Sequence, residues 1–356
     1  MKKALIAMSG GVDSSVSAHL MKKEGYECVG CTMRLYENNI IGEDMLSTCC
    51  SLKDTQDARS VCERLDMPYH IFHFENLFQK EVIEHFVCSY ENGLTPNPCI
   101  ECNRRFKFDH LFDKMEQFDC DYIVTGHYAR IEKDENTQRY VLKKAVDLSK
   151  DQSYVLYTMT QNQLAHTIFP LGGYKKTEVR EIAIENNFVN AKKHESQDIC
   201  FVPDGDYVGF MERYRNKKYK EGLFKDTKGN VLGKHKGYVH YTIGQRKGLG
   251  IALGHPAFVV DIDPKENVVV IGSNEDLFKT ALEATNINLI SVENLYEPRH
   301  IKAKIRYGMT EQPATVEQID EDRIRVVFDE PQRAITRGQA VVLYDGDVVV
   351  GGGVIC

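Results

Sequence analysis

The chain has 356 residues, of which 42% are hydrophobic and 27% charged, and its formal net charge is −7. This length predicts two or three domains of a soluble globular protein. No apolar run approaches the roughly 18–20 residues of a membrane span and no signal peptide is evident, so we expect no membrane partner. Eleven cysteines without a secretory start predict a reducing, cytoplasmic setting, where thiols are free, catalytic or metal-binding rather than a disulfide scaffold.

The net negative charge argues against a general polyanion binder, but it conceals an uneven distribution. Residues 190–250 carry 13 Lys and Arg against 7 Asp and Glu, a local charge of +6, which leaves −13 for the rest of the chain. A local basic surface is enough to hold an RNA backbone. A solvated lysine-rich face is the alternative, and charge alone does not separate the two.

The first predicted element is a strand over Lys3–Met8, followed by a turn of small residues over Ser9–Ser15 and then by a helix. A strand, a glycine turn and a helix N-terminus form an anion site, because free N–H groups and the helix dipole meet at one point. The glycines permit tight curvature, and the serines add hydroxyl donors. An ordinary strand–helix turn is the alternative.

The pattern Ser-Gly-Gly-x-Asp-Ser resembles the pyrophosphate loop of enzymes that split ATP to AMP and pyrophosphate. It is not a Walker A loop, because the spacing differs and no lysine follows the glycines. It is also not the dinucleotide fingerprint G-x-G-x-x-G.

Strands and helices then alternate over the first ~120 residues, which predicts a parallel sheet with helices on both faces. We predict strands at 27–35, 69–74 and 122–125 and helices at 55–65, 78–90 and 106–118. Ligands of such sheets bind beyond the carboxyl ends of the strands. Ser9–Ser15, Met33 and Gly126-His127 all lie at that end, so we expect them to form one nucleotide site. Taken singly, Met33 reads as a core residue and His127 as a structural histidine.

The predicted secondary structure changes twice in the rest of the chain. Residues 38–48 predict a mobile loop and 130–144 a hairpin, and helical patterns follow at 163–169, 176–186 and 206–214. From about residue 222 short apolar runs alternate with Gly and Asp turns, which predicts small β-barrel modules. The expected domains are an α/β domain (1–145), a central, mostly helical domain (146–221) and a β-rich region with a C-terminal β-barrel (222–356).

Two cysteine segments carry the chemistry that we expect. Cys99 and Cys102 form a C-x-x-C between two prolines and a basic helix, and a helix N-terminus with nearby cations lowers the pKa of a thiol. Cys200 follows Lys192, Lys193 and His194. One thiol that carries a sulfane sulfur and a second that resolves it would form a relay. Equally, Cys99, Cys102 and Cys200 could ligate an iron–sulfur cluster with one iron open, whereas zinc lacks a fourth ligand.

The other cysteines are interpreted as packing residues or left open. Cys28 and Cys31 have the same C-x-x-C spacing but lie inside a predicted strand, so we expect both in the core. Cys62, Cys88 and Cys120 lie on apolar faces. Cys49 and Cys50, beside the predicted loop, are ambiguous.

With these motifs in order, the chain resembles the tRNA 2-thiouridylases of the bacterial and mitochondrial type, nearly end to end. The matching motifs include Met8–Ser15, Asn97-Pro98, Cys102-Asn103, Thr125–Arg130, Lys150–Tyr154, Lys176 with Glu178 and Arg180, Ser196–Phe201, Tyr241–Ile251, Arg306-Tyr307, Pro331–Ile335 and Gly338-Gln339. The resemblance implies an adenine-nucleotide α-hydrolase-like (PP-loop) domain, a central helical tRNA-binding domain and a C-terminal β-barrel.

The resemblance also implies residue roles. ATP would be held by Ala7, Met8, Ser9, Gly10, Gly11, Val12, Asp13, Ser14, Met33 and Gly126. Asn97, Pro98 and Cys99 would face the target base, Cys102 would be the nucleophile or resolving thiol, and Cys200 would carry the persulfide. Contacts to tRNA would come from His127, Lys150, Asp151, Gln152, Arg306, Tyr307 and Gln339.

The expected reaction replaces the C2 oxygen of the wobble uridine with sulfur. ATP, with Mg²⁺, would adenylate that oxygen and so make AMP a good leaving group. Sulfur would come from Cys200 or from a possible [4Fe-4S] cluster, and an upstream sulfur donor protein would supply it. The base would be unstacked from the single-stranded loop of the tRNA anticodon stem-loop.

One departure from the family pattern concerns this chemistry. Many relatives have Asp, a candidate acid or base, where this chain has Cys99, and the replacement strengthens the cluster hypothesis here. Two other functions share parts of the pattern. Small-molecule adenylation with amide transfer needs no paired thiols, and a non-enzymatic RNA-binding module leaves the loop unexplained. Cytidine thiolation is a third alternative, but we do not expect it with this C-terminal half.

Overall fold

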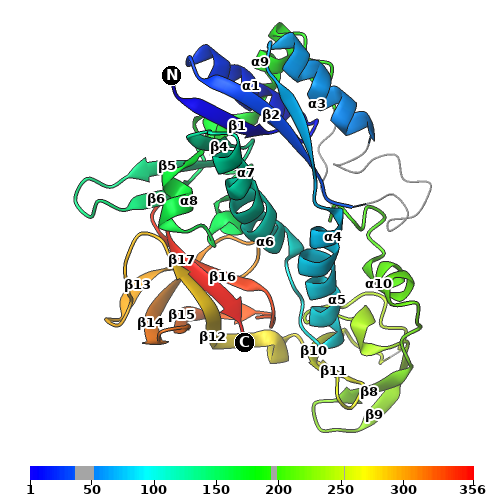
Figure 1. The fold of residues 1–356 in the computed structure, drawn as a ribbon. Helices are drawn as coiled ribbons and strands as arrows, with labels where there is room; N and C mark the ends of the chain where they lie inside the picture. Colours follow the sequence, from blue (N-terminus) through cyan, green and yellow to red (C-terminus); the bar gives the residue numbers. More distant parts are fainter. Residues whose placement is uncertain (37–51, 194–198, 252) are drawn as a thin grey trace. The chain divides into compact units, whose positions relative to one another are not determined.

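The computed structural model describes residues 1–36, 52–193, 199–251 and 253–356 (Figure 1). The predicted loop at 38–48, with Cys49 and Cys50, lies outside the described residues. Two compact units interleave along the chain. Unit 1 comprises Met1–Ile83, Pro98–Gly205 and Asp347–Val350, and unit 2 comprises Glu84–Asn97, Asp206–Gly346 and Gly351–Cys356.

A parallel sheet forms the centre of unit 1, and within the described residues its strand order is β3-β2-β1-β4-β7. All the neighbouring strands run parallel. The strands are β1 (Lys3–Ala7), β2 (Glu27–Arg34), β3 (Tyr69–His73), β4 (Tyr122–Val124) and β7 (Thr167–Ile168). The predicted parallel sheet and its first four strands are therefore confirmed.

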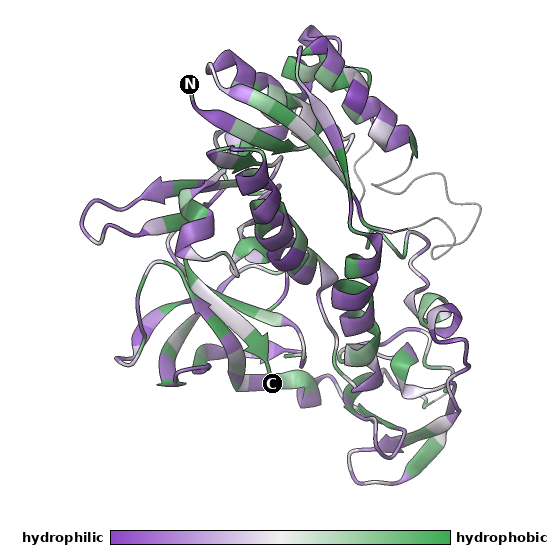
Figure 2. Ribbon diagram, in the orientation of Figure 1, coloured by the Kyte–Doolittle hydropathy of each residue, from purple (hydrophilic) through white to green (hydrophobic). Residues whose placement is uncertain are grey.

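Helices cover both faces of this sheet, as the alternation of strand and helix predicts. Along β1, Ala4 and Ile6 pack with Val16 and Val179 from the helices on one face. Leu5 between them packs with Leu111 and Met115 on the other face. This division follows from the two-residue period of a strand. Figure 2 shows the outward face of the helix that carries Met115 as hydrophilic.

The helical segments of unit 1 include the three predicted at 55–65, 106–118 and 176–186. They are α1 (Val12–Lys23), α3 (Leu52–Arg64), α4 (Glu75–Phe78), η1 (Gln79–Ile83), α6 (Pro98–Cys102), η2 (Asn103–His110), α7 (Leu111–Gln117), η3 (Ser153–Leu156), α8 (Gln161–Ala165), η4 (Pro170–Gly173) and α9 (Lys176–Glu185). The helix predicted at 78–90 is divided among α4, η1 and α5 (Glu84–Glu91).

The helix predicted at 163–169 is wrong in its second half. Thr160 and Gln163 form a capping box that begins α8 early, and the helix ends at Ala165. The next residues, β7, pair with Ile123 and Val124 of β4 at the edge of the parallel sheet. Thr167 and Ile168 are β-branched, which suits a strand, and the pairing partner lies too far away in sequence for a local pattern to reveal it.

A hairpin also belongs to unit 1 and confirms the prediction at 130–144. Its strands are β5 (Ala129–Lys133) and β6 (Tyr140–Lys144), and β6 pairs with Val348 and Val349 at the start of β17 (Val348–Ile355). Arg130 donates to the Asp347 carboxylate over 2.6 Å.

Unit 2 contains a mixed sheet with the order β10-β11-β8-β9 among its described residues. Its core includes Phe224, Tyr241, Val259 and Val269. The predicted helix at 206–214 is confirmed, because Asp206 accepts a hydrogen bond from the Gly209 N–H and so caps the helix. The elements are α10 (Tyr207–Arg215), β8 (Gly222–Asp226), β9 (Val231–His235), η5 (Tyr238–His240), β10 (Phe258–Asp263) and β11 (Val268–Gly272).

The second part of unit 2 is an antiparallel barrel, which confirms the predicted C-terminal β-barrel. Its described strands follow the order β12-β15-β14-β13-β16-β17, and pairing of β12 with β17 closes the ring. The interior includes Ala303, Val316 and Val326. The elements are η6 (Glu275–Leu277), β12 (Phe278–Leu289), β13 (Arg299–Lys304), β14 (Gln312–Asp320), β15 (Arg323–Arg333), β16 (Ala340–Asp345) and β17.

Within the described ranges, no helix has the length and apolar character that crossing a membrane requires.

Candidate active site

The loop between β1 and α1 is the centre of the candidate site. β1 ends at Ala7, α1 begins at Val12, and Gly10 has φ = +71°. A Cβ on Gly10 would lie 2.7 Å from the Cα of Asp54, so α3 packs directly against the loop and only glycine fits there.

Serine hydroxyl groups hold this loop in shape. Ser14 Oγ accepts from the Ser9 N–H over 3.2 Å and donates to the Gly11 carbonyl over 3.0 Å. Ser15 Oγ donates to the same carbonyl over 3.0 Å. These bonds tie the end of the strand to the first turn of the helix, whose leading N–H groups have no acceptor inside the helix. The loop therefore has the donors and dipole that a phosphate requires.

Gly126, after β4, lies against this first turn. A Cβ on Gly126 would be 2.9 Å from both the Asp13 carbonyl carbon and the Ser14 nitrogen. Cys31 pairs with Ala7, the last residue of β1, so Met33 extends β2 beyond that end. All three segments therefore lie at the carboxyl end of the sheet, and the nucleotide site that they are expected to form stays a prediction.

A lysine that the residue patterns did not single out neutralises the loop aspartate. Lys176 Nζ lies 2.7 and 2.8 Å from the two carboxylate oxygens of Asp13. Tyr128 donates its hydroxyl to Asp13 Oδ1 over 2.8 Å. Lys176 is 8% exposed, and a buried ammonium needs such a partner. In the sequence, Lys176 stood out only as part of a motif shared with the family, and that motif did not predict its contact with Asp13.

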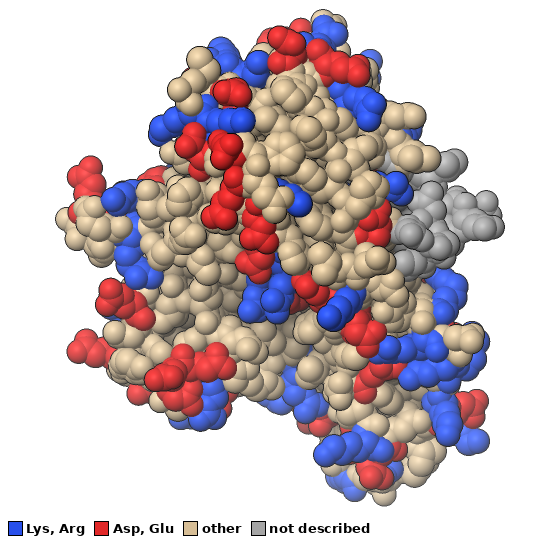
Figure 3. Space-filling model, in the orientation of Figure 1, with Lys and Arg blue, Asp and Glu red and all other residues tan. Residues whose placement is uncertain are grey.

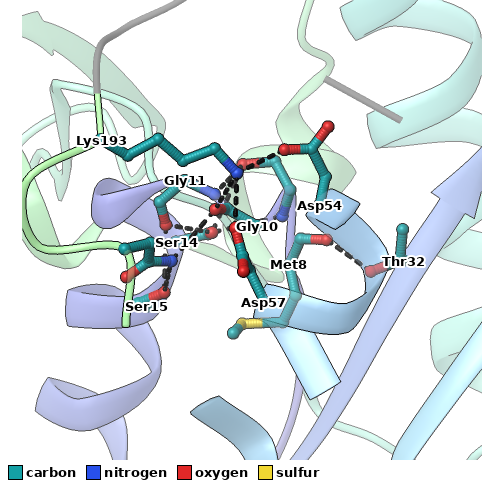
Figure 4. A network of polar contacts seen from close by, with 11 residues as sticks. Met8, Gly10, Gly11, Ser14, Ser15, Thr32, Asp54, Asp57 and Lys193 are labelled. Atoms are coloured by element: carbon teal, nitrogen blue, oxygen red, sulfur yellow. Dashed lines mark hydrogen bonds and ion pairs between the residues drawn. The ribbon is translucent and has the colours of Figure 1, made fainter. Parts of the chain in front are cut away.

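A second lysine reaches the loop from further along the chain (Figure 4). Lys193 Nζ donates to the Gly10 carbonyl over 3.1 Å, to Asp57 over 2.7 Å and to Asp54. Burial lowers the pKa of Lys193, but its hydrogen bonds to the two aspartates outweigh that effect and raise the pKa. Asn190 Nδ2 donates to the same Gly10 carbonyl over 3.0 Å and to Ser15 Oγ over 2.9 Å. In the sequence, Lys193 stood out only as a basic residue before Cys200.

The C-x-x-C segment lies differently from the prediction. We expected a helix that begins after Cys102, but Pro98 begins it, and the helical run continues through α6 into η2. Proline is favoured in the first position of a helix, where its missing N–H costs nothing. Cys99 therefore lies in the first turn and is exposed, while Cys102 is half-buried one turn later on the same face. The electrostatic effect of the helix N-terminus falls mainly on Cys99.

Cys200 is half-buried, just beyond residues that the structure does not describe. Among the described residues, no group of three or more His, Cys, Asp or Glu side chains is arranged to hold a metal ion. In its present arrangement this part of the chain therefore does not fit the possible iron–sulfur cluster.

The cysteines predicted to be packing residues are mostly buried. Burial raises the pKa of Cys28 to about 11 and that of Cys62 to about 12, and it also raises the pKa of Cys31. Cys120 is buried as well. Cys88 is half-buried and contacts charged groups, since its Sγ donates to Glu84 over 3.1 Å.

Several residues expected to touch tRNA make contacts inside unit 1. Asp151 Oδ1 accepts the N–H groups of Ala145 and Ser153, and Gln152 accepts the N–H of Tyr128. His127 is 6% exposed. Lys150 donates its backbone N–H to the Asp147 carbonyl over 3.0 Å. Their contacts to RNA stay predictions.

Of the residues in unit 2 that are expected to contact RNA, two make contacts inside the unit and one is exposed. Arg306 Nη2 donates to the Ile243 and Ala334 carbonyls, and Gln339 donates to the Thr95 carbonyl over 2.7 Å. Tyr307 is 42% exposed. Through Gln339, the barrel holds the segment that leads to Asn97.

The fold and the loop define a class: an α/β protein with a nucleotide-type anion site joined to β modules. Three family models match successive parts of the chain. They are the tRNA methyl transferase HUP domain (residues 2–204), the tRNA methyl transferase PRC-barrel domain (208–273) and the aminomethyltransferase beta-barrel domain (279–355).

The most similar relatives identify the family. The chain is 53% identical over 354 residues to tRNA-specific 2-thiouridylase MnmA of Clostridioides difficile, covering 99% of this chain and 98% of that one. It is 50% identical over 354 residues to the protein of the same name from Clostridium kluyveri, covering 99% of both chains. The chain belongs to the tRNA-specific 2-thiouridylase MnmA family.

Proposed function

We propose that this protein is an ATP-dependent sulfurtransferase that 2-thiolates the wobble uridine of tRNA. The observation that carries the proposal is the 53% identity over 354 residues to a relative named tRNA-specific 2-thiouridylase. The loop geometry supports the energy source, because an anion cradle at the end of β1 suits the phosphates of ATP.

In the first step, the C2 oxygen of uridine attacks the α-phosphorus of ATP. An O–P bond forms and the bond to pyrophosphate breaks, so AMP becomes attached to the base. The N–H groups and hydroxyls of the loop would stabilise the negative charge of the departing pyrophosphate. The ATP-binding residues are those predicted: Ala7, Met8, Ser9, Gly10, Gly11, Val12, Asp13, Ser14, Met33 and Gly126.

Mg²⁺ would supply further charge neutralisation at the phosphates. Asp13 is the acidic residue of the loop, but its carboxylate is bonded to Lys176 and Tyr128. Mg²⁺ would therefore be held mainly by the phosphate oxygens and water. In this proposal Asp13 orients the first turn of α1 through Lys176.

In the second step, sulfur replaces the activated oxygen. The terminal sulfur of a persulfide on Cys200 attacks C2, and AMP leaves with the former C2 oxygen. Cys102, as thiolate, then attacks Cys200 Sγ, so the persulfide S–S bond breaks, the sulfur stays on the base and a Cys102–Cys200 disulfide forms. A cellular thiol must reduce this disulfide, and an upstream sulfur donor must reload Cys200.

Cys99 gives this chain a C-x-x-C on one helix face, and a cluster-bound hydrosulfide is the alternative sulfur source. We derive no step through a cluster, because the described side chains do not fit one. The relay needs only the thiols of Cys102 and Cys200, so thiolation that persists without Cys99 would exclude a cluster that Cys99 ligates.

The anticodon stem-loop of tRNA is the proposed substrate, because its single-stranded wobble base can be turned into a pocket. Asn97, Pro98 and Cys99 are the proposed contacts to that base. In unit 2, Lys and Arg side chains gather near α10 and β8–β9, with acidic groups between them (Figure 3). Such a surface suits a phosphate backbone.

The test combines the purified protein, [³²P]ATP, a persulfide source and tRNA with uridine or cytidine at the wobble position. We expect AMP, pyrophosphate and 2-thiouridine with the uridine tRNA alone, with 2-thiouridine measured by mass spectrometry. ATP cleavage that does not depend on tRNA would contradict the proposal and favour small-molecule adenylation.

A further inference from the structure

The Gly10 carbonyl accepts two hydrogen bonds from one distant segment. Asn190 Nδ2 is 3.0 Å and Lys193 Nζ 3.1 Å from this oxygen, although both residues follow α9. Figure 4 shows Lys193 reaching across the loop to Gly10 and to the two aspartates of α3. Two donors on one backbone oxygen of a glycine loop restrict the rotation of that peptide group.

The hydrogen-bond network determines the orientation of the Asn190 amide. The Gly10 carbonyl can only accept, and Ser15 Oγ already donates its hydrogen to Gly11, so it accepts from Asn190. The amide nitrogen must therefore face the loop. Asn190 is 2% exposed, and its Oδ1 has no hydrogen-bond partner among the described residues. The two bonds that its nitrogen donates to the loop explain why this polar side chain is buried here.

The consequence for the loop follows from peptide geometry. In a trans peptide the C=O and the next N–H point in opposite directions. A Gly10 carbonyl held toward Asn190 and Lys193 therefore turns the Gly11 N–H away from them. That N–H donates a long bond, 3.4 Å, to Ser9 Oγ, which a phosphate oxygen can replace.

We propose that Asn190 and Lys193 are positioning residues that hold the Gly10–Gly11 peptide so that its N–H faces a phosphate of ATP. The inference rests on the proposed function, because it assumes that the loop binds ATP. It adds two residues to the ATP site, and both come from the segment that leads to Cys200. The bonds from Asn190 and Lys193 to the Gly10 carbonyl therefore link the loop that would bind ATP to the segment that precedes Cys200.

The test measures affinity for α,β-methylene ATP, which cannot be cleaved between the α and β phosphates, by calorimetry of the full chain without tRNA. We expect Lys193→Met to weaken binding by about tenfold or more and Asn190→Ala by several-fold. Lys193→Arg, which keeps the charge and a donor, should recover most of the affinity. Lys192→Met is the matched control, because Lys192 is adjacent and exposed, and it should bind as the wild type does.

Kinetics and a second variant separate positioning from packing. In tRNA-dependent AMP formation, Lys193→Met should raise the KM for ATP and leave the KM for tRNA unchanged. In Asp54→Asn/Asp57→Asn, which removes the ion pairs but keeps the Gly10 contact, ATP affinity should fall less than in Lys193→Met. Equal losses in these two variants, with equal losses of thermal stability, would show that Lys193 acts only through α3.

The two proposals fail in different ways. If the wild type binds the analogue and Lys193→Met and Asn190→Ala bind it equally well, the positioning role is refuted and the proposed function stands. If the wild type does not bind the analogue, the proposed function falls, and this inference falls with it.

Discussion

Lys107 Nζ lies 3.2 Å from His127 Nε2 in the interior of unit 1. An ammonium can only donate, so Nε2 accepts, and the imidazole carries its hydrogen on Nδ1, 2.6 Å from Thr125 Oγ1. Burial lowers the pKa of His127 well below its ordinary value, and the charge of Lys107 lowers it further. His127 is therefore neutral at pH 7 and fills a structural position beside Gly126.

This pairing predicts a pH dependence of stability. Between the lowered folded pKa and the ordinary value near 6.5, only the unfolded chain binds a proton at His127, so stability falls as the pH falls, by at most about 1.4 kcal/mol per pH unit. Urea unfolding of the wild type and of His127→Gln at pH 5–8 measures it. The glutamine variant should lose less stability on acidification, and parallel curves for the two proteins would contradict the assignment.

Gly126→Ala should damage the nucleotide site. The new Cβ would lie 2.9 Å from the backbone of the first turn of α1, so that turn must move. We expect a loss of about 1–3 kcal/mol in stability and weaker binding of the ATP analogue. Gly173→Ala is the control, because a Cβ there meets nothing within 4 Å. Equal stability and equal binding of the ATP analogue in the two variants would show that Gly126 is not part of the site.

Cys200→Ser should abolish thiolation while tRNA-dependent AMP formation persists, because serine cannot carry a persulfide. The measurement is [³²P]AMP release beside mass spectrometry of the tRNA. Cys356→Ser, at an exposed cysteine, should retain both activities. Thiolation at the wild-type rate by Cys200→Ser would refute the role of this thiol.

Cys99→Ser tests the cluster route. We expect the variant to lose thiolation, and thiolation at the wild-type rate would exclude a cluster that Cys99 ligates. Anaerobic purification with iron, sulfide and absorbance measurements completes the test. A colourless, iron-free and fully active wild type would exclude the cluster.

Gln339→Ala should loosen the segment before Asn97, because it removes the 2.7 Å bond to the Thr95 carbonyl. We expect a stability loss of about 1 kcal/mol together with slower thiolation. Gln312→Ala is the control, because the Gln312 side chain donates to the carbonyl of Thr310, two residues away. Weaker tRNA binding with unchanged stability would instead support the direct RNA contact that the resemblance implies.

Local residue patterns predicted much of the fold. The strand at β1, the glycine turn and the start of α1 are contiguous, so their residues alone predict the anion loop. The alternation of strands and helices likewise predicted Gly126 beside that loop, because parallel strands end at one edge. The same approach failed at β7, where a strand of two residues depends on its partner β4, and at Cys102, where Pro98 begins the helix earlier than expected.

By itself, the sequence determined the class of fold and the strand–turn–helix loop, since each is a local arrangement of residue types. It also predicted ATP binding at that loop and sulfur transfer by the cysteines. Only the tertiary structure decided which charges complete the loop. Lys176 is 163 residues from Asp13 in the chain, and Lys193 is 183 residues from Gly10. No local periodicity encodes such a pairing. It follows from the packing of helices on the sheet, which buries Lys176 and partly buries Lys193 beside carboxylates that pair with their ammonium groups.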